Sequence, residues 1–319
     1  MRKRNVLVTA IGTMNCTTII KELKKHKDMF HIIGADINPG NLIANSKDVD
    51  EFYTFPKVTD NRELYYEYIK DFCIKNRVDL IFCVVDEEVA LLSKNREELK
   101  QLGVTLCVAN DSCVRLCHNK DLFSNWIEEN IPKLYIKRFA LPSDVSESDF
   151  PVFIKPIEGR ASIGCTMVNS YNELTKYFHV WDEYVVQEYI NSPIVAVDIV
   201  CNRASGQMEI AQRIELLRNA NGCGIAVEIV DNTDIREACF ELAEKLELNG
   251  VVNVEMFLTD DGPKIIEVNP RIPAGVEYSC LAGLNVVMNA LYIATDNPCV
   301  FDPIKIGKFY TKRYETIEM

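Results

Sequence analysis

Two carboxylates and one amide in the last quarter of the sequence have the spacing of a metal site. Glu267 follows Glu255 after eleven intervening residues, and Asn269 comes two positions later. The segment Thr259-Asp-Asp-Gly-Pro263 between the acids predicts a hairpin turn, which places Glu255 nearly opposite Glu267. Residues two apart on a strand face the same side, so three oxygen-bearing side chains converge. Adjacent carboxylates repel each other without a cation, and Mg²⁺ prefers such oxygen ligands.

An arginine extends this pattern toward phosphate chemistry. Arg271 follows Asn269 after a single proline, and the loop Ile272-Pro-Ala-Gly275 after it is able to approach a phosphate. A single acid on a surface hairpin would carry little information. The unit E-x11-E-x-N-P-R as a whole indicates a site where a divalent cation and a phosphate meet.

A second motif combines a lysine with a loop of small residues. Lys155 and Pro156 end an apolar run, and Ile157-Glu158-Gly159-Arg160-Ala161-Ser162-Ile163-Gly164 follows. A lysine is a point charge suited to phosphate oxygens, and small loop residues expose backbone N–H groups. An ordinary turn after a strand-end lysine would look the same. The loop is not a Walker A loop, because no Gly-Lys-Ser/Thr follows.

A third, weaker motif is Gln187-Glu188-Tyr189-Ile190, at the end of an apolar run. An extended backbone beside an apolar wall can form hydrogen bonds with the edge of an adenine ring. Any buried strand with one polar face would look similar.

The elements that must position these residues are predicted from hydrophobic periodicity. In the first 108 residues, strand patterns at 5–10, 31–35, 80–85 and 104–108 alternate with helical patterns at 17–27, 64–75 and 87–102. This alternation is typical of a doubly wound parallel sheet, which places ligands beyond the carboxyl ends of its strands. Further along, strands are predicted at 152–156, 184–190, 209–216, 253–258 and 264–268, with a helix at 231–248. The fold class is therefore α/β, with an α+β arrangement in the C-terminal part.

The first strand-to-helix turn argues against a nicotinamide dinucleotide. The segment Ala10-Ile-Gly-Thr-Met-Asn15 has one glycine rather than G-x-G-x-x-G, so we interpret Asp36 as a polar strand-end residue. Asp86-Glu87-Glu88 follows the third strand and could face a cleft. We prefer the interpretation that these acids begin a helix, where they complement its dipole.

Composition limits the class of partner. The 319 residues carry a formal net charge of −12, which argues against nucleic acid or an anionic membrane as the main partner. No apolar stretch approaches the 18 residues of a membrane span, and the basic N-terminus is followed by too short an apolar run for a signal peptide. We therefore expect a cytoplasmic protein whose 12 cysteines are reduced and mostly buried.

Taken in order, these motifs resemble the ATP-grasp superfamily. The matching residues are Lys120, Lys155-Pro156 with its loop, Gln187–Ile190, Glu255 and Glu267-Val-Asn269-Pro-Arg271, and the chain is most similar to carbamoyl-phosphate-synthase-like and amino-acid-ligase-like members. The resemblance implies a pre-ATP-grasp Rossmann-like domain at 1–108. It also implies a two-subdomain ATP-grasp fold, with a lid subdomain and its connecting segment at 109–190 and a C-terminal subdomain with the magnesium site at 191–319.

The resemblance also implies a role for each residue. ATP would be bound by Lys120, Lys155, the loop residues Glu158, Ser162 and Gly164, and the adenine-side residues Gln187, Glu188, Tyr189 and Ile190. Glu255, Glu267 and Asn269 would bind Mg²⁺, with Mn²⁺ as an alternative, and Arg271 would meet the γ-phosphate or an acyl phosphate. Arg213 and Asn253 would contribute to the substrate pocket. The sequence departs from the family pattern at Ile194, where an acid that holds the ribose is expected.

The implied activity is that of an ATP-dependent carboxylate–amine ligase, which forms an acyl phosphate and releases ADP and phosphate. The expected partners are a small-molecule carboxylate and an amine, and a homodimer is compatible with the family. Two alternatives stay open. One is a carbamoyl-phosphate-synthase-like subunit that needs a partner, which is disfavoured because the chain ends soon after one ATP-grasp unit. The other is an ATP-binding protein without turnover, which would not need the full set from Glu255 to Arg271.

Overall fold

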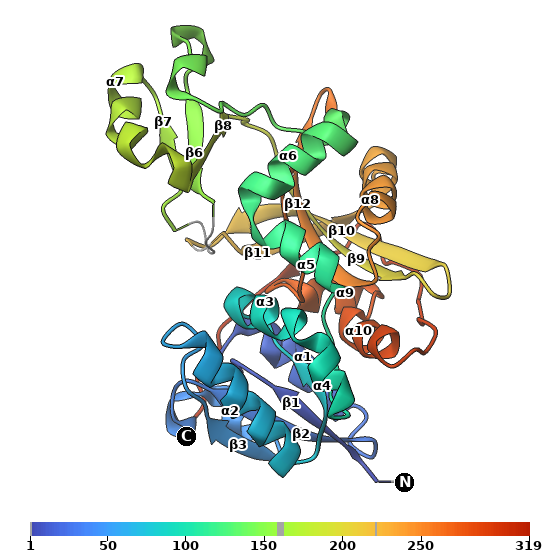
Figure 1. The fold of residues 1–319 in the computed structure, drawn as a ribbon. Coiled ribbons are helices and arrows are strands. Elements are labelled where there is room, and N and C mark those ends of the chain that lie inside the picture. Colours follow the sequence, from blue (N-terminus) through green and yellow to red (C-terminus); the bar gives the residue numbers. More distant parts are fainter. Residues whose placement is uncertain (1, 158–162, 221) are drawn as a thin grey trace.

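The described part of the chain forms three β-sheets, one parallel and two antiparallel (Figure 1). The computed structural model describes residues 2–157, 163–220 and 222–319. The parallel sheet has the strand order β3-β2-β1-β4-β5, a three-stranded sheet has the order β7-β6-β8, and a six-stranded sheet has the order β13-β12-β9-β10-β11-β14. The predicted mixed α/β class, with a parallel N-terminal sheet, is confirmed.

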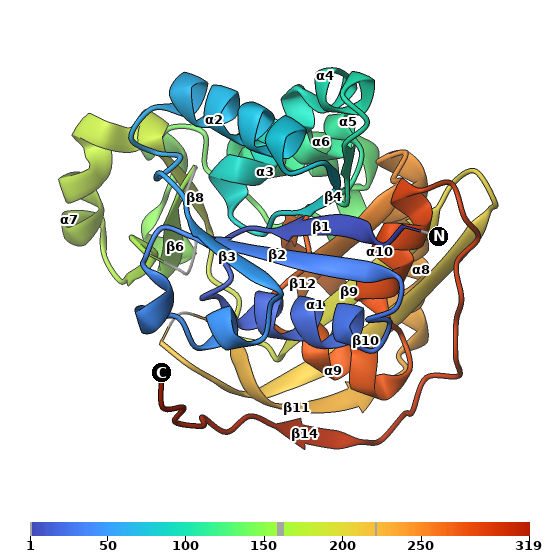
Figure 2. The same cartoon turned by 90° about the horizontal axis from the view of Figure 1, so that it is seen from below.

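The N-terminal unit is a parallel sheet with helices on both faces (Figure 2). Its elements are β1 (Arg4–Val8), α1 (Met14–Lys24), β2 (Phe30–Asp36), β3 (Glu51–Thr54), α2 (Arg62–Lys75), β4 (Val78–Phe82), α3 (Asp86–Lys94), α4 (Arg96–Gln101) and β5 (Thr105–Leu106). Alternate residues of β1 face opposite layers: Val6 and Val8 pack in the cluster that contains α1, and Leu7 in the cluster that contains α2. Burial on both faces explains why these strands read as continuous apolar runs.

The predicted helix at 87–102 is wrong in one respect, because the structure divides it at Asn95. Helix α3 ends at Lys94, and α4 begins at Arg96. The Asn95 side chain donates a hydrogen bond to the Leu91 carbonyl at 2.9 Å, which competes with regular helix geometry. Arg96 then donates to the carbonyls of Val108 and Ala109, where the chain leaves the parallel sheet.

Three helices and a small sheet form the next part of the chain. They comprise α5 (Asp111–His118), α6 (Lys120–Asn130), β6 (Val152–Pro156), β7 (Thr166–Val168), α7 (Tyr171–Leu174) and β8 (Tyr184–Glu188). The three strands and α7 form a separate lobe with its own small core around Trp181 (Figure 1). The lobe meets the rest of the molecule at the end of β6 that carries Lys155.

The six-stranded sheet is the body of the C-terminal part. It contains β9 (Ile194–Asn202), β10 (Gln207–Arg218), β11 (Gly224–Val230), β12 (Gly250–Thr259), β13 (Gly262–Asn269) and β14 (Phe309–Thr311). Three helices, α8 (Thr233–Lys245), α9 (Val276–Ala282) and α10 (Val286–Ala294), pack against it. Helix α8 packs in the cluster that contains α2, and α10 in the cluster that contains α1. The same two cores therefore run through both the parallel sheet and the six-stranded sheet.

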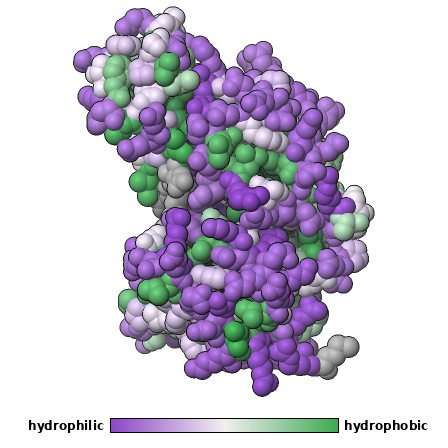
Figure 3. Space-filling view, viewed as in Figure 1, coloured by the Kyte–Doolittle hydropathy of each residue, from purple (hydrophilic) through white to green (hydrophobic). Residues whose placement is uncertain are grey.

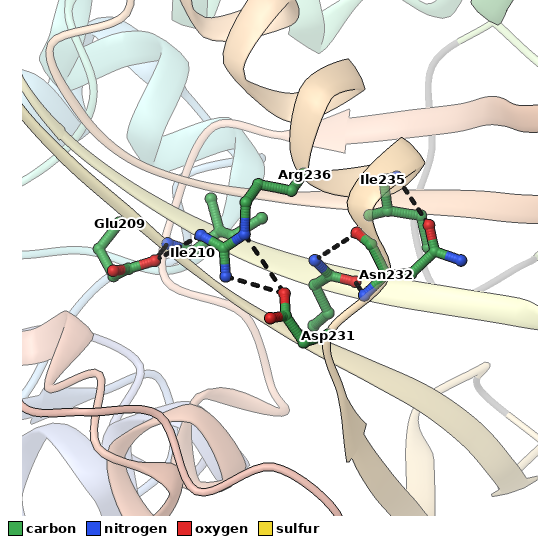
Figure 4. Close-up of polar contacts among 7 residues, drawn as sticks. Glu209, Ile210, Asp231, Asn232, Ile235 and Arg236 are labelled. Atoms are coloured by element: carbon green, nitrogen blue, oxygen red, sulfur yellow. Dashed lines mark hydrogen bonds and ion pairs between the residues drawn. The ribbon is translucent and has the colours of Figure 1, made fainter.

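Polar contacts fix the start of α8 against the sheet (Figure 4). The Asn232 side chain accepts a hydrogen bond from the Ile235 N–H at 3.0 Å, which caps the first turn of the helix. Arg236 forms ion pairs with Asp231 at 3.0 Å and with Glu209 on β10 at 2.9 Å. These partly exposed pairs orient the helix and involve none of the residues predicted to carry the chemistry.

The described surface is predominantly hydrophilic on the face of Figure 3, with hydrophobic side chains in small separate groups. No single helix in the described ranges is long and apolar enough to cross a membrane. In the same ranges, α9 and α10 taken together meet the test of length and composition, but they are bent by 95° at the break between them.

Candidate active site

The hairpin of β12 and β13 brings the predicted metal ligands to one face. Glu255 pairs in register with Glu267, and Asn253 pairs with Asn269. The Asn269 amide nitrogen lies 3.3 Å from Glu267 Oε1 and 3.4 Å from Asn253 Oδ1. A β-bulge between Glu255 and Met256 shifts the register by one residue, so the pairing of Glu255 with Glu267 depends on this bulge as well as on the turn at 260–261.

The negative charges on this face of the β12–β13 hairpin favour a nearby cation. Burial and the neighbouring Glu267 raise the pKa of Glu255 to about 7, although Arg218 opposes the shift. Arg218 Nη2 lies 2.7 Å from Glu255 Oε2, and its Nε lies 2.7 Å from Glu215 Oε2. One guanidinium therefore balances part of the charge of two acids, and Glu267 is not among its partners.

The donor set fits a hard divalent cation of the magnesium type. Glu255, Glu267 and Asn269 offer two carboxylates and one amide oxygen, which are ligands that Mg²⁺ takes together with substrate phosphates. Within the described ranges, no group of three or more His, Cys, Asp or Glu side chains could hold a metal ion. A metal at this hairpin would thus depend on the Asn269 amide and on oxygens of a bound nucleotide.

Lys155 lies against the same hairpin. Its ammonium donates a hydrogen bond to the Ile266 carbonyl at 2.9 Å, immediately before Glu267. The side chain is 7% exposed, and burial lowers the pKa of Lys155 to about 8, with Glu267 opposing and Lys120 adding to the shift. A buried ammonium beside a carboxylate pair can hold a phosphate oxygen at the metal-facing end of a nucleotide.

Lys120, Lys155, Gln187 and Glu267 line one small cavity between the lobe and the hairpin. Lys120 is the first residue of α6, and its backbone N–H donates to the Ile157 carbonyl at 3.2 Å. The cavity has a volume of about 20 Å³, close to the space that one water needs.

The predicted adenine-side residues lie at the end of β8. Gln187 is buried, whereas Tyr189 is 40% exposed. Glu188 exchanges hydrogen bonds with Lys137: its N–H donates to the Lys137 carbonyl at 2.9 Å, and its side chain accepts from the Lys137 N–H at 3.1 Å. Ile190 lies two residues beyond the end of β8. Ile194 is the first residue of β9 and stands where the family pattern has an acid that holds the ribose.

The loop after Lys155 is described only at its end. Gly164 has a φ of +78°, and a Cβ at this position would lie 2.9 Å from Pro156 Cγ. Glycine therefore allows the chain to fold back on Pro156. The predicted contacts of Glu158 and Ser162 lie outside the described residues.

Arg271 is held by an acid from the parallel sheet. Its Nε lies 2.5 Å from Asp86 Oδ1, and its Nη2 lies 3.2 Å from Asp86 Oδ2. The predicted helix start at Asp86 is confirmed, since α3 begins there with three acids in its first turn. Asp86 has a second role that the sequence did not reveal, because its side chain also reaches the C-terminal part. Glu88 is buried and accepts hydrogen bonds from Thr9 and Tyr65.

Arg213 and Asn253 form a buried network around Asp198. Asp198 is fully buried and accepts from Arg213 Nη1 at 2.9 Å, Asn253 Nδ2 at 2.8 Å and Ser279 Oγ at 2.6 Å. Both predicted pocket residues are only 2% exposed. Their contribution to substrate binding stays a prediction, and Asn253 connects this network to the hairpin, since its Oδ1 lies 3.4 Å from the Asn269 amide nitrogen.

Sequence reasoning missed Arg218 and Lys312 as members of this region. Arg218 ends β10, and Lys312 directly follows β14. Arg218 is the last residue of an ordinary strand pattern, and Lys312 follows a strand of only three residues. No motif in the sequence distinguishes either residue from an exposed basic residue.

The fold and the site together define an ATP-grasp protein. A family model for the ATP-grasp domain matches residues 117–275, and a model for the PylC-like N-terminal domain matches residues 6–107. The chain belongs to the ATP-grasp superfamily.

Curated and solved proteins agree with this assignment. The chain is 24% identical over 272 residues to a 3-methyl-D-ornithine–L-lysine ligase of Methanosarcina acetivorans, which covers 83% of this chain and 67% of the relative. It is 26% identical over 261 residues to a carbamoyl phosphate synthase large chain of Saccharolobus islandicus, covering 72% of this chain and 24% of the relative. The biotin carboxylase domain of 2-oxoglutarate carboxylase from Hydrogenobacter thermophilus, solved with MgADP, ADP and bicarbonate, superposes with a TM-score of 0.77 at 14% identity, over 97% of this chain and 74% of that one.

Proposed function

We propose that this chain is an ATP-dependent carboxylate–amine ligase that works through an acyl phosphate and releases ADP and phosphate. The observation that carries the proposal is the convergence of the Glu255–Glu267 pair with the Lys155 ammonium, which is bonded to the carbonyl next to Glu267. This combination supplies both a place for a divalent cation and a cationic contact for phosphate oxygens. The similarity to a ligase that joins two amino acids supports the same reaction class.

We propose a role for each of these residues. Lys155 and Lys120 hold the phosphates of ATP, and Gln187 with the end of β8 holds the adenine side. Glu255, Glu267 and Asn269 would hold Mg²⁺, which when bound would draw charge from the phosphates and orient them. Arg271, oriented by Asp86, stabilises negative charge on the transferred phosphoryl group. The substrate carboxylate attacks the γ-phosphorus, and the amine then displaces phosphate from the acyl phosphate.

Catalysis by such a site depends on positioning and electrostatics. None of the four histidines of the chain, His26, His31, His118 and His179, lies in these motifs, and the reaction requires no Ser–His pair. The acidic composition agrees with small-molecule substrates rather than nucleic acid. We also propose the division into 1–108, 109–190 and 191–319, because each part carries its own sheet or its own side of the site.

The test is release of ADP and phosphate from MgATP, screened against pairs of amino acids and small carboxylates. Release that requires one carboxylate and one amine, together with a product of their summed mass less one water, would support a ligase. No release, while ATP still raises the melting temperature, would contradict turnover by this chain alone and favour a binding protein or a subunit that needs a partner.

A further inference from the structure

The last described strand brings a lysine to the loop that follows Arg271. Strand β14 pairs antiparallel with β11 at the outer edge of the six-stranded sheet, with Thr311 opposite Ala226 (Figure 2). The pairing continues one residue further, where the Lys312 N–H donates to the Ile225 carbonyl at 2.9 Å. The backbone of Lys312 is therefore fixed at the start of β11.

The side chain of Lys312 is directed inward. Its ammonium donates to the Ala274 carbonyl at 2.9 Å and lies 5.2 Å from the centre of the Tyr278 ring. Tyr278 is fixed in turn, because its hydroxyl bonds to the carbonyls of Gly224 and Ile225 at 3.1 Å. Burial lowers the pKa of Lys312, although Glu277 opposes this effect. The ammonium thus occupies a defined, half-buried position beside the loop after Arg271.

Lys312 differs from the other cations of this region in its partners. Asp86 neutralises Arg271, Asp198 neutralises Arg213, and Glu215 and Glu255 neutralise Arg218. Among the described residues, Lys312 has no carboxylate within ion-pair distance. The nearby Glu277 pairs with Lys21 at 3.2 Å. An ammonium has three donors, and the Ala274 carbonyl uses one of them.

The position of Lys312 relative to the hairpin follows from a shared neighbour. The Cys223 thiol, in the turn between β10 and β11, lies within electrostatic range of Lys312 and of Glu255, and it contributes to the environment of Arg271. Lys312 therefore lies beside the loop that follows Arg271, and it shares the Cys223 thiol as a neighbour with Glu255.

We propose that Lys312 binds a substrate carboxylate that is not phosphorylated. This inference rests on the proposed ligase function. The reacting carboxylate belongs next to Arg271 and the hairpin acids, whereas an ammonium beyond Ala274 suits a second anionic group of the same or the other substrate. An amino acid that reacts through its amine, and keeps its own carboxylate, has this chemistry. Lys312 would then select amino acids over simple amines.

The experiment compares each amino acid that supports ADP release with its carboxamide, which lacks the charge. The variants are Lys312→Met, and Lys312→Gln, which keeps a donor for Ala274 but removes the charge. Lys305→Met is the matched control, since exposed Lys305 on the same segment also donates to a carbonyl, that of Leu281, at 3.0 Å. We expect the wild type and Lys305→Met to prefer the acid over the amide in kcat/KM. Both Lys312 variants should lose about 10- to 100-fold with the acid and little with the amide, with the KM for ATP unchanged.

Three results would overturn the inference. One is an acid-to-amide preference in Lys312→Gln equal to that of the wild type. Another is an equal loss with acid and amide together with a lower melting temperature, which would show that Lys312 only attaches the strand. The third is wild-type turnover that never depends on a non-reacting carboxylate. Absence of wild-type ADP release with any tested pair would instead remove the proposed function on which the inference rests, and it is distinguished by the wild-type assay alone.

Discussion

Arg271 and Asp86 join the two halves of the molecule through a two-point ion pair, with 2.5 Å between Nε and Oδ1 and 3.2 Å between Nη2 and Oδ2. Arg271 follows the hairpin of candidate metal ligands, and Asp86 begins a helix of the parallel sheet. Burial would lower the pKa of Arg271, but Asp86 outweighs it and the pKa is raised, so the guanidinium stays charged. The N-terminal unit thus orients a cation of the C-terminal site.

Asp86→Asn should weaken both folding and turnover. Loss of a charge-assisted hydrogen-bond pair should lower the free energy of unfolding by about 2 kcal/mol. Without its partner, Arg271 loses its orientation, and kcat should fall at least tenfold. Urea unfolding and ADP release measure the two effects. Glu97→Gln, in the exposed first turn of α4, is the control, and equal effects in the two variants would contradict a specific role for the pair.

Glu267→Gln should abolish turnover while the fold stays intact. The change removes a charge at the candidate metal site without changing the shape of the side chain. The melting temperature without ligands should stay close to that of the wild type, whereas the further rise that Mg²⁺ produces in the presence of ATP should disappear. A variant with full activity would show that the metal site is misplaced.

Binding of metal-free ATP should depend on the protonation of Lys155. Because burial lowers the pKa of Lys155 to about 8, the ammonium is charged below that pH and neutral above it. The anionic nucleotide favours the charged form, so its dissociation constant should rise roughly tenfold between pH 7 and pH 9. Calorimetric titration of the wild type and of Lys155→Arg checks this sign. Arginine stays charged throughout, and the same slope in both proteins would assign the effect to another group.

Asp198→Asn should be strongly destabilising. Asp198 is fully buried and neutralises the buried Arg213, so its removal leaves an uncompensated charge and should cost about 3 kcal/mol in the free energy of unfolding. Asp231→Asn breaks the exposed pair with Arg236 in Figure 4 and should cost less than about 1 kcal/mol. Chemical denaturation measures the free energy of unfolding of both variants. Similar losses in the two would show that the buried Asp198–Arg213 pair contributes no more to stability than the exposed Asp231–Arg236 pair.

The parts of the site that depend on local sequence were predictable. The turn at 260–261 and the bulge after Glu255 lie within one hairpin and together place Glu255 opposite Glu267, and Lys155 is positioned by the strand β6 in which it is the last residue but one. The alternation of strands and helices likewise predicted the parallel sheet. In these cases the residues that determine the structure lie within one hairpin or one element.

The parts that depend on distant segments were not predictable. Arg271 and Asp86 are 185 residues apart, and no periodic pattern relates them. Lys312 reaches the loop after Arg271 because a three-residue strand joins a sheet edge, and Arg218 reaches Glu255 from the end of the long strand β10. The break at Asn95 was missed for a different reason, since an asparagine within an exposed helical pattern gives no sign of where its side chain will bond.

The hairpin geometry also implies an order of events during folding. Glu255 and Glu267 meet by closing a short loop, whereas Arg271 and Asp86 must bring together segments 185 residues apart. Since short loops close faster and at lower entropic cost, the two carboxylates should approach each other before the distant parts of the site assemble. The nascent hairpin would therefore carry mutual repulsion that slows its formation. Refolding should then be faster in mildly acidic buffer, or when a divalent cation is present from the first moments, than at neutral pH with a chelator.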